Sequence, residues 1–180
     1  MAEYSLTLPL KREDIEKLRA GDSVKLTGTI YGARDAAHKR FFELLQKGEV
    51  LPVPKGGTIY YVGPCPAAPG EVIGPCGPTT SARMDPYTPA VLDYGVVGLI
   101  GKGPRCDAVL DALKNNTAVY FAATGGAGTL LSSRVKACRV IAFPELGTEA
   151  VHEMEVEDFP VIVAADCFGG NLYRDRKPLK

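Results

Sequence analysis

Short apolar runs alternate with amphipathic segments along this chain. Residues 33–47 carry Ala37, Phe41, Leu44 and Leu45 at helical spacing, which predicts an amphipathic helix. Shorter helices are expected at residues 11–19, 86–94, 104–113 and 127–133. Runs rich in β-branched and aromatic residues predict strands at residues 4–10, 23–31, 59–62, 96–100, 118–123, 140–143 and 161–165. This recurrence of a strand followed by a helix indicates an α/β fold.

The length and composition fit one globular unit. The chain has 180 residues, of which 46% are hydrophobic, and this is enough to bury one core. It contains no internal repeat, long linker or low-complexity tract, so we expect a single domain over residues 1–180. Residues 64–78 are dense in glycine and proline, and a loop of that length in a compact domain is usually functional.

Charge and cysteine usage narrow the possible classes of protein. The 21 Lys and Arg residues balance the 21 Asp and Glu residues, which disfavours a nucleic-acid partner. No apolar run approaches the ~18 residues of a membrane span, and the first residues lack a signal-peptide pattern. We therefore expect a cytoplasmic protein with no membrane partner. The odd cysteine count and the lack of any C-x-x-C pair favour free thiols over disulfides or a zinc site; the cysteines are Cys65, Cys76, Cys106, Cys138 and Cys167.

Residues 77–85, Gly-Pro-Thr-Thr-Ser-Ala-Arg-Met-Asp, lead from the glycine- and proline-rich loop toward a predicted helix. The hydroxyls of Thr79, Thr80 and Ser81 could bind an anion together with the first free N–H groups of that helix. The guanidinium of Arg83 suits a carboxylate bidentately, and Asp85 adds an acidic group. An N-cap followed by a solvated arginine explains the same spacing equally well.

Arg34 follows a predicted strand and opens the amphipathic helix, at a turn that faces the mouth of an α/β domain. It could bind an anion there or form an ion pair with Asp35. His38 is better explained as a structural helix residue than as a metal ligand, because Phe42 occupies the position four residues later.

Two glycine-rich segments also follow predicted strands. Lys102 lies between Gly101 and Gly103, but Val96 and Gly103 break the P-loop pattern, so the lysine is either an anion ligand or an exposed turn residue. In the other segment, residues 124–129, Leu131 stands where the dinucleotide fingerprint needs its third glycine. Close packing is favoured over an anion nest at Gly125 and Gly126.

Together, Arg34, Arg83 and Lys102 follow three different predicted strands in a chain with no net charge. Three cations at three separate strand ends would suit a ligand with two carboxylates. A non-catalytic organic-acid-binding module would have the same three cations, so the spacing does not decide between binding and catalysis.

Five segments, residues 31–40, 77–85, 101–103, 125–127 and 155–160, occur in the order found in the iron–sulfur fumarate and tartrate hydro-lyases. The resemblance covers nearly the whole chain and is to the half of these enzymes that carries no cluster ligands. His152, where an aromatic residue is common, and Gly128-Thr129, where small apolar residues are usual, depart from the family pattern.

This resemblance implies an α/β fold of the swivelling β/β/α type, and a β subunit that acts with a cluster-bearing α subunit in an αβ heteromer or its dimer. The partner would hold a [4Fe–4S] cluster, and this chain would bind no metal itself. The implied reaction is the hydration of fumarate to L-malate, and L-tartrate dehydration is the alternative.

The resemblance also assigns roles to residues. Thr79 would be the catalytic base, and Arg34, Arg83 and Lys102 would bind the dicarboxylate, with Thr80, Ser81, Asp85, Gly125 and Gly126 in supporting positions. A threonine hydroxyl is a weak base by itself, so the partner subunit, its iron or Asp85 would have to assist Thr79.

Overall fold

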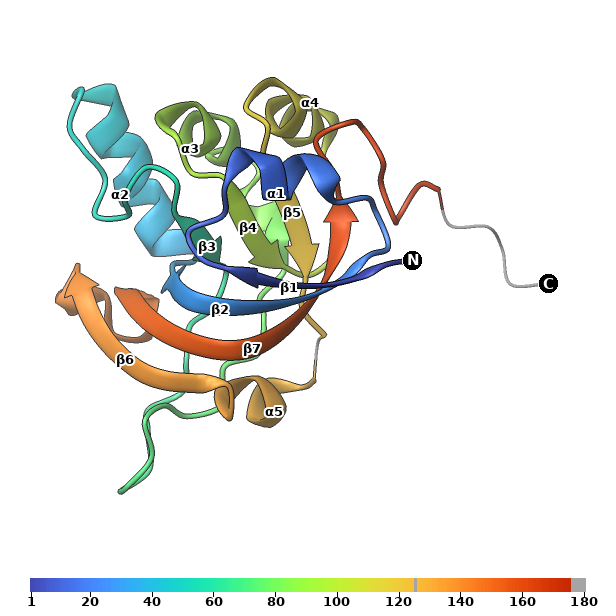
Figure 1. Ribbon diagram of the computed structural model, residues 1–180. Coiled ribbons are helices and arrows are strands. Elements are labelled where there is room, and N and C mark those ends of the chain that lie inside the picture. The colour runs from blue at the N-terminus through green and yellow to red at the C-terminus, as the bar shows by residue number, and fades with distance from the viewer. Residues whose placement is uncertain (125, 176–180) are drawn as a thin grey trace.

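A computed structural model describes residues 1–124 and 126–175 (Figure 1). The helices are α1 (Arg12–Lys17), α2 (Asp35–Gln46), α3 (Thr88–Tyr94), α4 (Asp107–Asn115) and α5 (Gly128–Ser132), with two 3₁₀ helices, η1 (Ser81–Met84) and η2 (Pro144–Glu149). The strands are β1 (Glu3–Thr7), β2 (Ser23–Gly32), β3 (Thr58–Tyr60), β4 (Gly98–Gly101), β5 (Val119–Ala122), β6 (Val135–Ala142) and β7 (Val151–Ala165). Helices and strands therefore mix along the chain, as the sequence predicts.

The strands form one sheet in the order β1-β2-β3-β4-β5-β7-β6, and a further pairing between β2 and β7 closes part of it. Five strands, β2, β3, β4, β5 and β7, thus make a closed barrel. Strands β2, β3, β4 and β5 run parallel to one another, whereas β7 runs antiparallel to both β2 and β5. Strands β1 and β6 extend the barrel wall at β2 and β7.

The prediction for the last strand was wrong in extent. We expected it at residues 161–165, but β7 has 15 residues and starts at Val151. Its first half alternates buried His152, Met154 and Val156 with glutamates that are more exposed, a period of two that marks a strand with one covered face. The sequence prediction selected only continuous apolar runs, so it missed this segment of alternating apolar and acidic residues. The strand before it is also longer than predicted, because β6 pairs with this first half of β7.

Two hydrophobic clusters lie on opposite faces of the strands. Alternate residues of one strand join different clusters, as with Tyr60 and Ile59 of β3. The first cluster includes Ile15 of α1 and Leu18 directly after it, and the second lies under α2, α3 and α4. Six aromatic side chains are fully buried, each stabilising the fold by about 2–3 kcal/mol; they are Phe41, Tyr60, Tyr61, Tyr120, Phe121 and Phe159.

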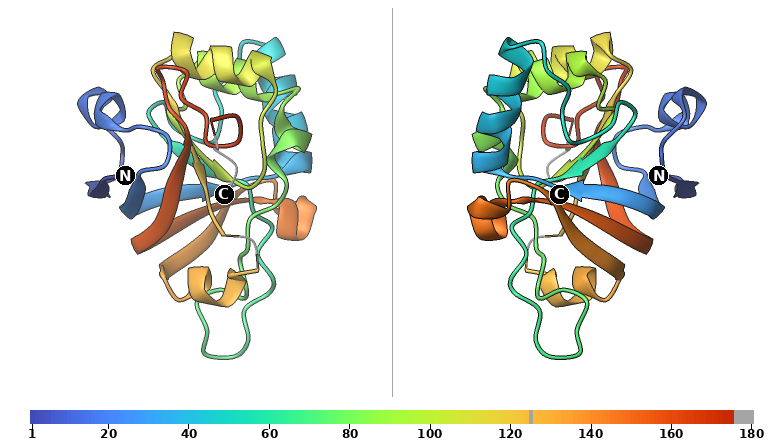
Figure 2. Two further views of the ribbon diagram at one scale, coloured as in Figure 1. Left: turned by 90° about the vertical axis from the view of Figure 1, so that its right-hand side faces the viewer. Right: turned by 90° about the vertical axis from the view of Figure 1, so that its left-hand side faces the viewer.

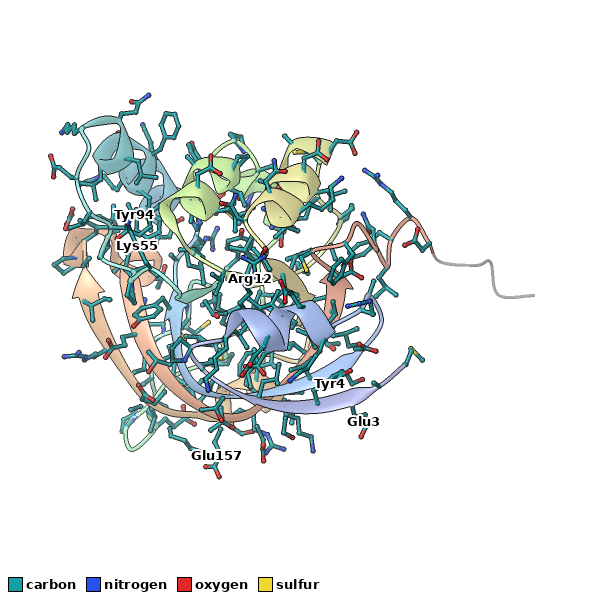
Figure 3. All side chains as sticks on the ribbon, turned by 45° about the horizontal axis from the view of Figure 1, so that its top comes forward. Glu3, Tyr4, Arg12, Lys55, Tyr94 and Glu157 are labelled. Atoms are coloured by element: carbon teal, nitrogen blue, oxygen red, sulfur yellow. The ribbon has the colours of Figure 1, made fainter. Side chains whose placement is uncertain are left out.

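The connection between α2 and β3 is fixed to α3 by one tyrosine. The Nζ atom of Lys55 lies 5.5 Å from the ring centre of Tyr94, and Figure 3 shows these two side chains next to each other. The backbone N–H of Leu51 donates to the Tyr94 hydroxyl at 3.3 Å. The longest helix, α2, has 12 residues, and no helix in the described ranges could cross a bilayer.

A long loop projects from the end of the molecule opposite α3 and α4 (Figure 2). It comprises residues 63–78, which connect β3 to η1. Its two arms pair through hydrogen bonds of 3.0 Å from Cys65 N to the Pro75 carbonyl and 3.2 Å from Gly74 N to the Cys65 carbonyl. The loop therefore leaves the barrel after β3 and returns to the same end.

Candidate active site

The C-terminal ends of β2, β3 and β4 lie side by side because these strands are parallel neighbours. Arg34 follows the end of β2, and Lys102 follows the end of β4. Thr79 comes back to the end of β3, where its N–H donates to the Tyr61 carbonyl at 2.8 Å, and Thr80 forms a parallel bridge with Lys102. The sequence analysis placed the cations at three different strand exits, and the structure shows that these exits adjoin one another.

Arg34 is the N-cap residue of α2, and its side chain is 29% exposed. Its Nε atom lies 3.1 Å from Asp35 Oδ2 and 3.2 Å from Glu149 Oε1. Its side chain lies across Gly63, where a Cβ atom would come within 2.9 Å of Arg34 Cδ. The ion pair with Asp35 considered from the sequence therefore forms, with Glu149 as a second partner that sequence spacing could not reveal.

Thr79 and Arg83 face each other across the start of η1. Arg83 Nη2 donates a hydrogen bond to the hydroxyl oxygen of Thr79, and Arg83 Nε lies 2.9 Å from Asp35 Oδ1. Partial burial alone would raise the pKa of Asp35, but its own backbone N–H and both arginines lower that pKa overall. One carboxylate thus bridges Arg34 and Arg83, and the bridge reaches Thr79 through Arg83.

The three hydroxyl residues of the 79–81 run have different environments. Thr79 is half-buried, Thr80 is exposed, and Ser81 is fully buried, with its Oγ atom 2.9 Å from the Tyr120 hydroxyl. The N–H of Ser81 donates to the Lys102 carbonyl at 3.0 Å. The sequence suggested free N–H groups at a helix start, but η1 is a four-residue 3₁₀ turn and the N–H groups of Thr79 and Ser81 are already paired. Side chains rather than these backbone groups are available for an anion.

Asp85 faces Arg105 rather than Thr79. Its Oδ1 atom lies 2.6 Å from Arg105 Nε, and its Oδ2 atom accepts from the N–H of Cys106 at 2.8 Å. Both carboxylate oxygens of Asp85 therefore bind residues of the connection between β4 and α4. Assistance to Thr79 from Asp85, which the sequence left open, has no contact to support it, whereas Arg83 contacts the hydroxyl directly.

Arg105 is a residue that sequence reasoning missed. Its side chain is 1% exposed, and it donates to Tyr61 Oη at 3.2 Å and to Thr88 Oγ1 at 2.8 Å. Its guanidinium also lies over the rings of Tyr61 and Tyr120, with centroids at 5.2 and 4.9 Å. Arg105 therefore connects η1, α3 and the strands behind the site. The sequence gives only one sign of Arg105, the pair Pro104-Arg105 before a predicted helix, and that pattern is typical of exposed arginines.

His38 is fully buried, as expected for a structural helix residue. Its Nδ1 atom lies 3.0 Å from the Arg34 carbonyl, which can only accept, so Nδ1 carries the proton. Burial lowers the pKa of His38 from 6.5 to about 4, and the ring is neutral at pH 7. The histidine thus fixes the main chain of Arg34 from inside α2.

The second glycine-rich segment leads into α5. Gly125 is outside the described residues, and Gly126 has a φ of +79°, a conformation that favours glycine. Close packing occurs at Gly128 instead, whose carbonyl accepts from Cys76 N at 3.3 Å. A cavity of about 530 Å³ is lined by Thr124 and Ala127, among others, but by none of the predicted site cations.

The cysteines are all free thiols in the structure. Cys76 is buried, and burial raises its thiol pKa to about 12. Cys65 and Cys138 line a cavity of about 360 Å³ together with His152. Across residues 1–124 and 126–175, no three His, Cys, Asp or Glu side chains gather as a metal site.

Comparison with known proteins identifies the family. The family model described as "Fumarase C-terminus" matches residues 2–176. The chain belongs to this family. The match includes β1 to β7 and every residue of the cluster around Asp35.

Three relatives illustrate the range of this fumarase C-terminal family. "Fumarate hydratase 2" of Leishmania major is 38% identical over 165 residues, which cover 90% of this chain and 29% of that protein. "Fumarate hydratase class I, anaerobic" of Escherichia coli strain K12 is 37% identical over 177 residues, which cover 96% of this chain and 32% of that protein. "Putative L(+)-tartrate dehydratase subunit beta" of Methanocaldococcus jannaschii is 38% identical over 180 residues, which cover 96% of this chain and 92% of that protein. The chain thus spans about a third of the fumarate hydratases and nearly all of the subunit.

Proposed function

We propose that this chain is the β subunit of an iron–sulfur-dependent hydro-lyase that adds water to fumarate to give L-malate. The observation that carries the proposal is the cluster of Thr79, Arg83, Asp35 and Arg34 at adjoining strand exits. The names of its relatives, fumarate hydratase and tartrate dehydratase, point to the same class of reaction.

In this proposal Arg34, Arg83 and Lys102 bind the carboxylates of the substrate. A guanidinium offers two parallel N–H donors that match a carboxylate, and these charge-assisted bonds are stronger than neutral ones. Arg83 and Lys102 are exposed at the strand exits, and Arg34 is partly exposed. These cations can therefore meet a ligand from the solvent side, and a partner that covers them would strengthen each contact by excluding water.

Thr79 carries the proton step. In the hydration direction its hydroxyl gives a proton to one alkene carbon of fumarate, which leaves an oxyanion on the side chain. The hydroxide of a water molecule adds to the other alkene carbon, and the proton left from that water returns to the Thr79 oxygen. Arg83 Nη2, which already donates to this oxygen, stabilises the negative charge of the oxyanion. In the dehydration direction the same oxygen takes the proton back. Arg83 thus has two roles, because it lowers the cost of the Thr79 oxyanion and presents its remaining N–H groups to the substrate.

The [4Fe–4S] cluster is assigned to the partner α subunit, because the described residues of this chain offer no group of metal ligands that fits it. A cluster iron there would act as a Lewis acid toward the substrate's hydroxyl and carboxylate. We infer that residues 1–180 act as one swivelling β/β/α domain within an αβ heteromer or its dimer. The loop at residues 63–78 projects beside the strand exits and would contribute to the contact.

Dehydration of L-tartrate is the second candidate reaction. The tartrate dehydratase subunit of M. jannaschii matches over 92% of its length, so it resembles this chain in size as well as in sequence. L-Tartrate differs from malate by one additional hydroxyl, which the site would have to accommodate.

Substitutions in the assembled enzyme test the proposal. Thr79→Val should lower kcat far more than it raises KM, because the proton step belongs to the transition state. Arg83→Ala should lower kcat/KM for fumarate by roughly tenfold or more, and Arg83→Lys should restore little because the planar donor pair is lost. Arg139→Ala, an exposed arginine on β6, is the matched control and should leave kcat/KM unchanged.

The same assays with L-tartrate decide between the two substrates through the ratio of their kcat/KM values. Full activity in both Thr79→Val and Arg83→Ala would contradict the assigned roles. If the unmodified assembly turned over neither acid, the proposed reaction would be wrong.

A further inference from the structure

The carboxylate of Asp35 lies between two arginines that come from different parts of the chain. Arg34 Nε donates to Asp35 Oδ2 at 3.1 Å. Arg83 reaches the same carboxylate from η1, with Nε 2.9 Å from Oδ1 and Nη2 donating to Oδ2 at 3.3 Å. We propose that Asp35 is a positioning residue, which holds both substrate-binding arginines and, through Arg83, the hydroxyl of Thr79. This inference rests on the proposed function of the site.

The geometry leaves donor groups of both arginines open to a ligand, namely the edge of Arg34 formed by its two terminal nitrogens and Nη1 of Arg83, whose Nη2 already bonds Asp35 and Thr79. Asp35 takes the Nε edge of Arg34 and the edge of Arg83 formed by Nε and Nη2. Within the described part of the chain, Nη1 of Arg83 and both terminal nitrogens of Arg34 have no hydrogen-bond partner. A carboxylate ligand can therefore bind these groups while Asp35 stays in place.

A fixed pair of arginines saves conformational entropy when the ligand binds. A free arginine side chain loses rotamer entropy when it is immobilised by a ligand, so arginines that are ordered beforehand bind the ligand more tightly. Glu149 adds a second contact to Arg34 at 3.2 Å, but it touches neither Arg83 nor Thr79. Asp35 is therefore the carboxylate that links all three groups.

Simple charge compensation makes the opposite prediction. Asp35 and Glu149 place two negative charges beside the two arginines, so removal of one carboxylate would make the site more positive. If Asp35 only compensated charge, Asp35→Asn would strengthen the binding of an anionic substrate. If it positions the arginines, Asp35→Asn weakens binding and slows the reaction despite the gain in positive charge.

The experiment uses the complex with the cluster-bearing subunit and measures kcat and KM with fumarate. We expect Asp35→Asn to lower kcat/KM roughly tenfold to a hundredfold, with KM raised and Tm lowered by no more than about 3 °C. Glu145→Gln is the matched control, because Glu145 is an exposed carboxylate whose partner is Arg40 at 3.1 Å, and it should behave as the unmodified protein. An unchanged or lower KM in Asp35→Asn would overturn the proposal.

Two further measurements separate positioning from general support of the fold. Thr79→Val and Asp35→Asn should be non-additive, so that the double variant loses less than the product of the two single losses. Full additivity would argue against a link through Arg83. If Asp35→Asn does not fold, Asp35→Glu keeps the charge but moves the carboxylate by one methylene. Positioning predicts a loss for this variant, and charge compensation predicts normal activity.

The activity of the unmodified complex separates this inference from the proposed function on which it rests. Hydration by the unmodified complex together with normal activity of Asp35→Asn would reject only the positioning role. Absence of hydration and of tartrate dehydration in the unmodified complex would reject the proposed function itself.

Discussion

The buried ion pair behind the site should contribute strongly to stability. Arg105→Leu keeps much of the apolar volume of the side chain but removes its charge, its contact of 2.6 Å with Asp85 and its bonds to Tyr61 and Thr88. Asp85, whose side chain is 11% exposed, would then keep only the N–H of Cys106 as a donor. Breaking a buried pair from one side costs about 3–5 kcal/mol, because an uncompensated charge stays in the interior.

The expected loss can be measured by urea unfolding followed by circular dichroism, and by thermal unfolding. For a domain of this size, 3–5 kcal/mol corresponds to a decrease in Tm of roughly 8–15 °C. Arg139→Leu is the matched control, since its ion pair with Glu153 at 2.8 Å is 72% exposed on the arginine side and is screened by solvent, so its loss should change stability little. Asp85→Asn added to Arg105→Leu should recover part of the loss. Equal losses for Arg105→Leu and Arg139→Leu would refute the reasoning.

Two other predictions concern His38 and Gly63. The folded-state pKa of His38, about 4, lies below its ordinary value of 6.5, so the unfolded chain binds more protons between these values and stability falls as pH falls through that range. The loss in unfolding free energy across this range is on the order of 3–4 kcal/mol. His38→Leu should flatten this part of the pH profile of unfolding free energy, and a variant with the original slope would disprove the assignment. Gly63→Ala would place a Cβ atom 2.9 Å from Arg34 Cδ and 3.2 Å from the Thr148 carbonyl, so it should displace Arg34 and raise KM severalfold at a stability cost of roughly 1–3 kcal/mol. An unchanged KM for fumarate would show that substrate binding does not depend on the place of the Arg34 side chain across Gly63.

Local patterns in the sequence were sufficient to predict most elements. The helix predicted at residues 33–47 corresponds to α2, and the apolar runs at residues 59–62, 96–100 and 118–123 overlap β3, β4 and β5. These segments are regular because a buried strand needs apolar residues on both faces and a covering helix needs one apolar stripe. The closure of the barrel by β7 could not be read from these runs, since it depends on pairing between β2 and residues more than a hundred positions away.

The cations of the site could be predicted, but their mutual arrangement could not. Arg34 and Lys102 follow strands directly, so the order of elements places them at strand ends. Thr79 and Arg83 reach the same end only because the loop at residues 63–78 returns to the barrel and Thr79 pairs with the Tyr61 carbonyl. The contact of Asp85 with Arg105 could not be predicted for a similar reason, because Arg105 is 20 residues away and gives no local signal.

The shared-site account is tested most directly by reconstitution. Fumarate hydration should be followed by the loss of fumarate absorbance under anaerobic conditions, for this chain alone, for a separately prepared cluster-bearing subunit alone, and for the mixture. The account predicts activity only in the mixture, because Thr79, Arg34, Arg83 and Lys102 come from this chain and the cluster from its partner. Full activity of this chain alone in chelator-treated buffer would contradict it.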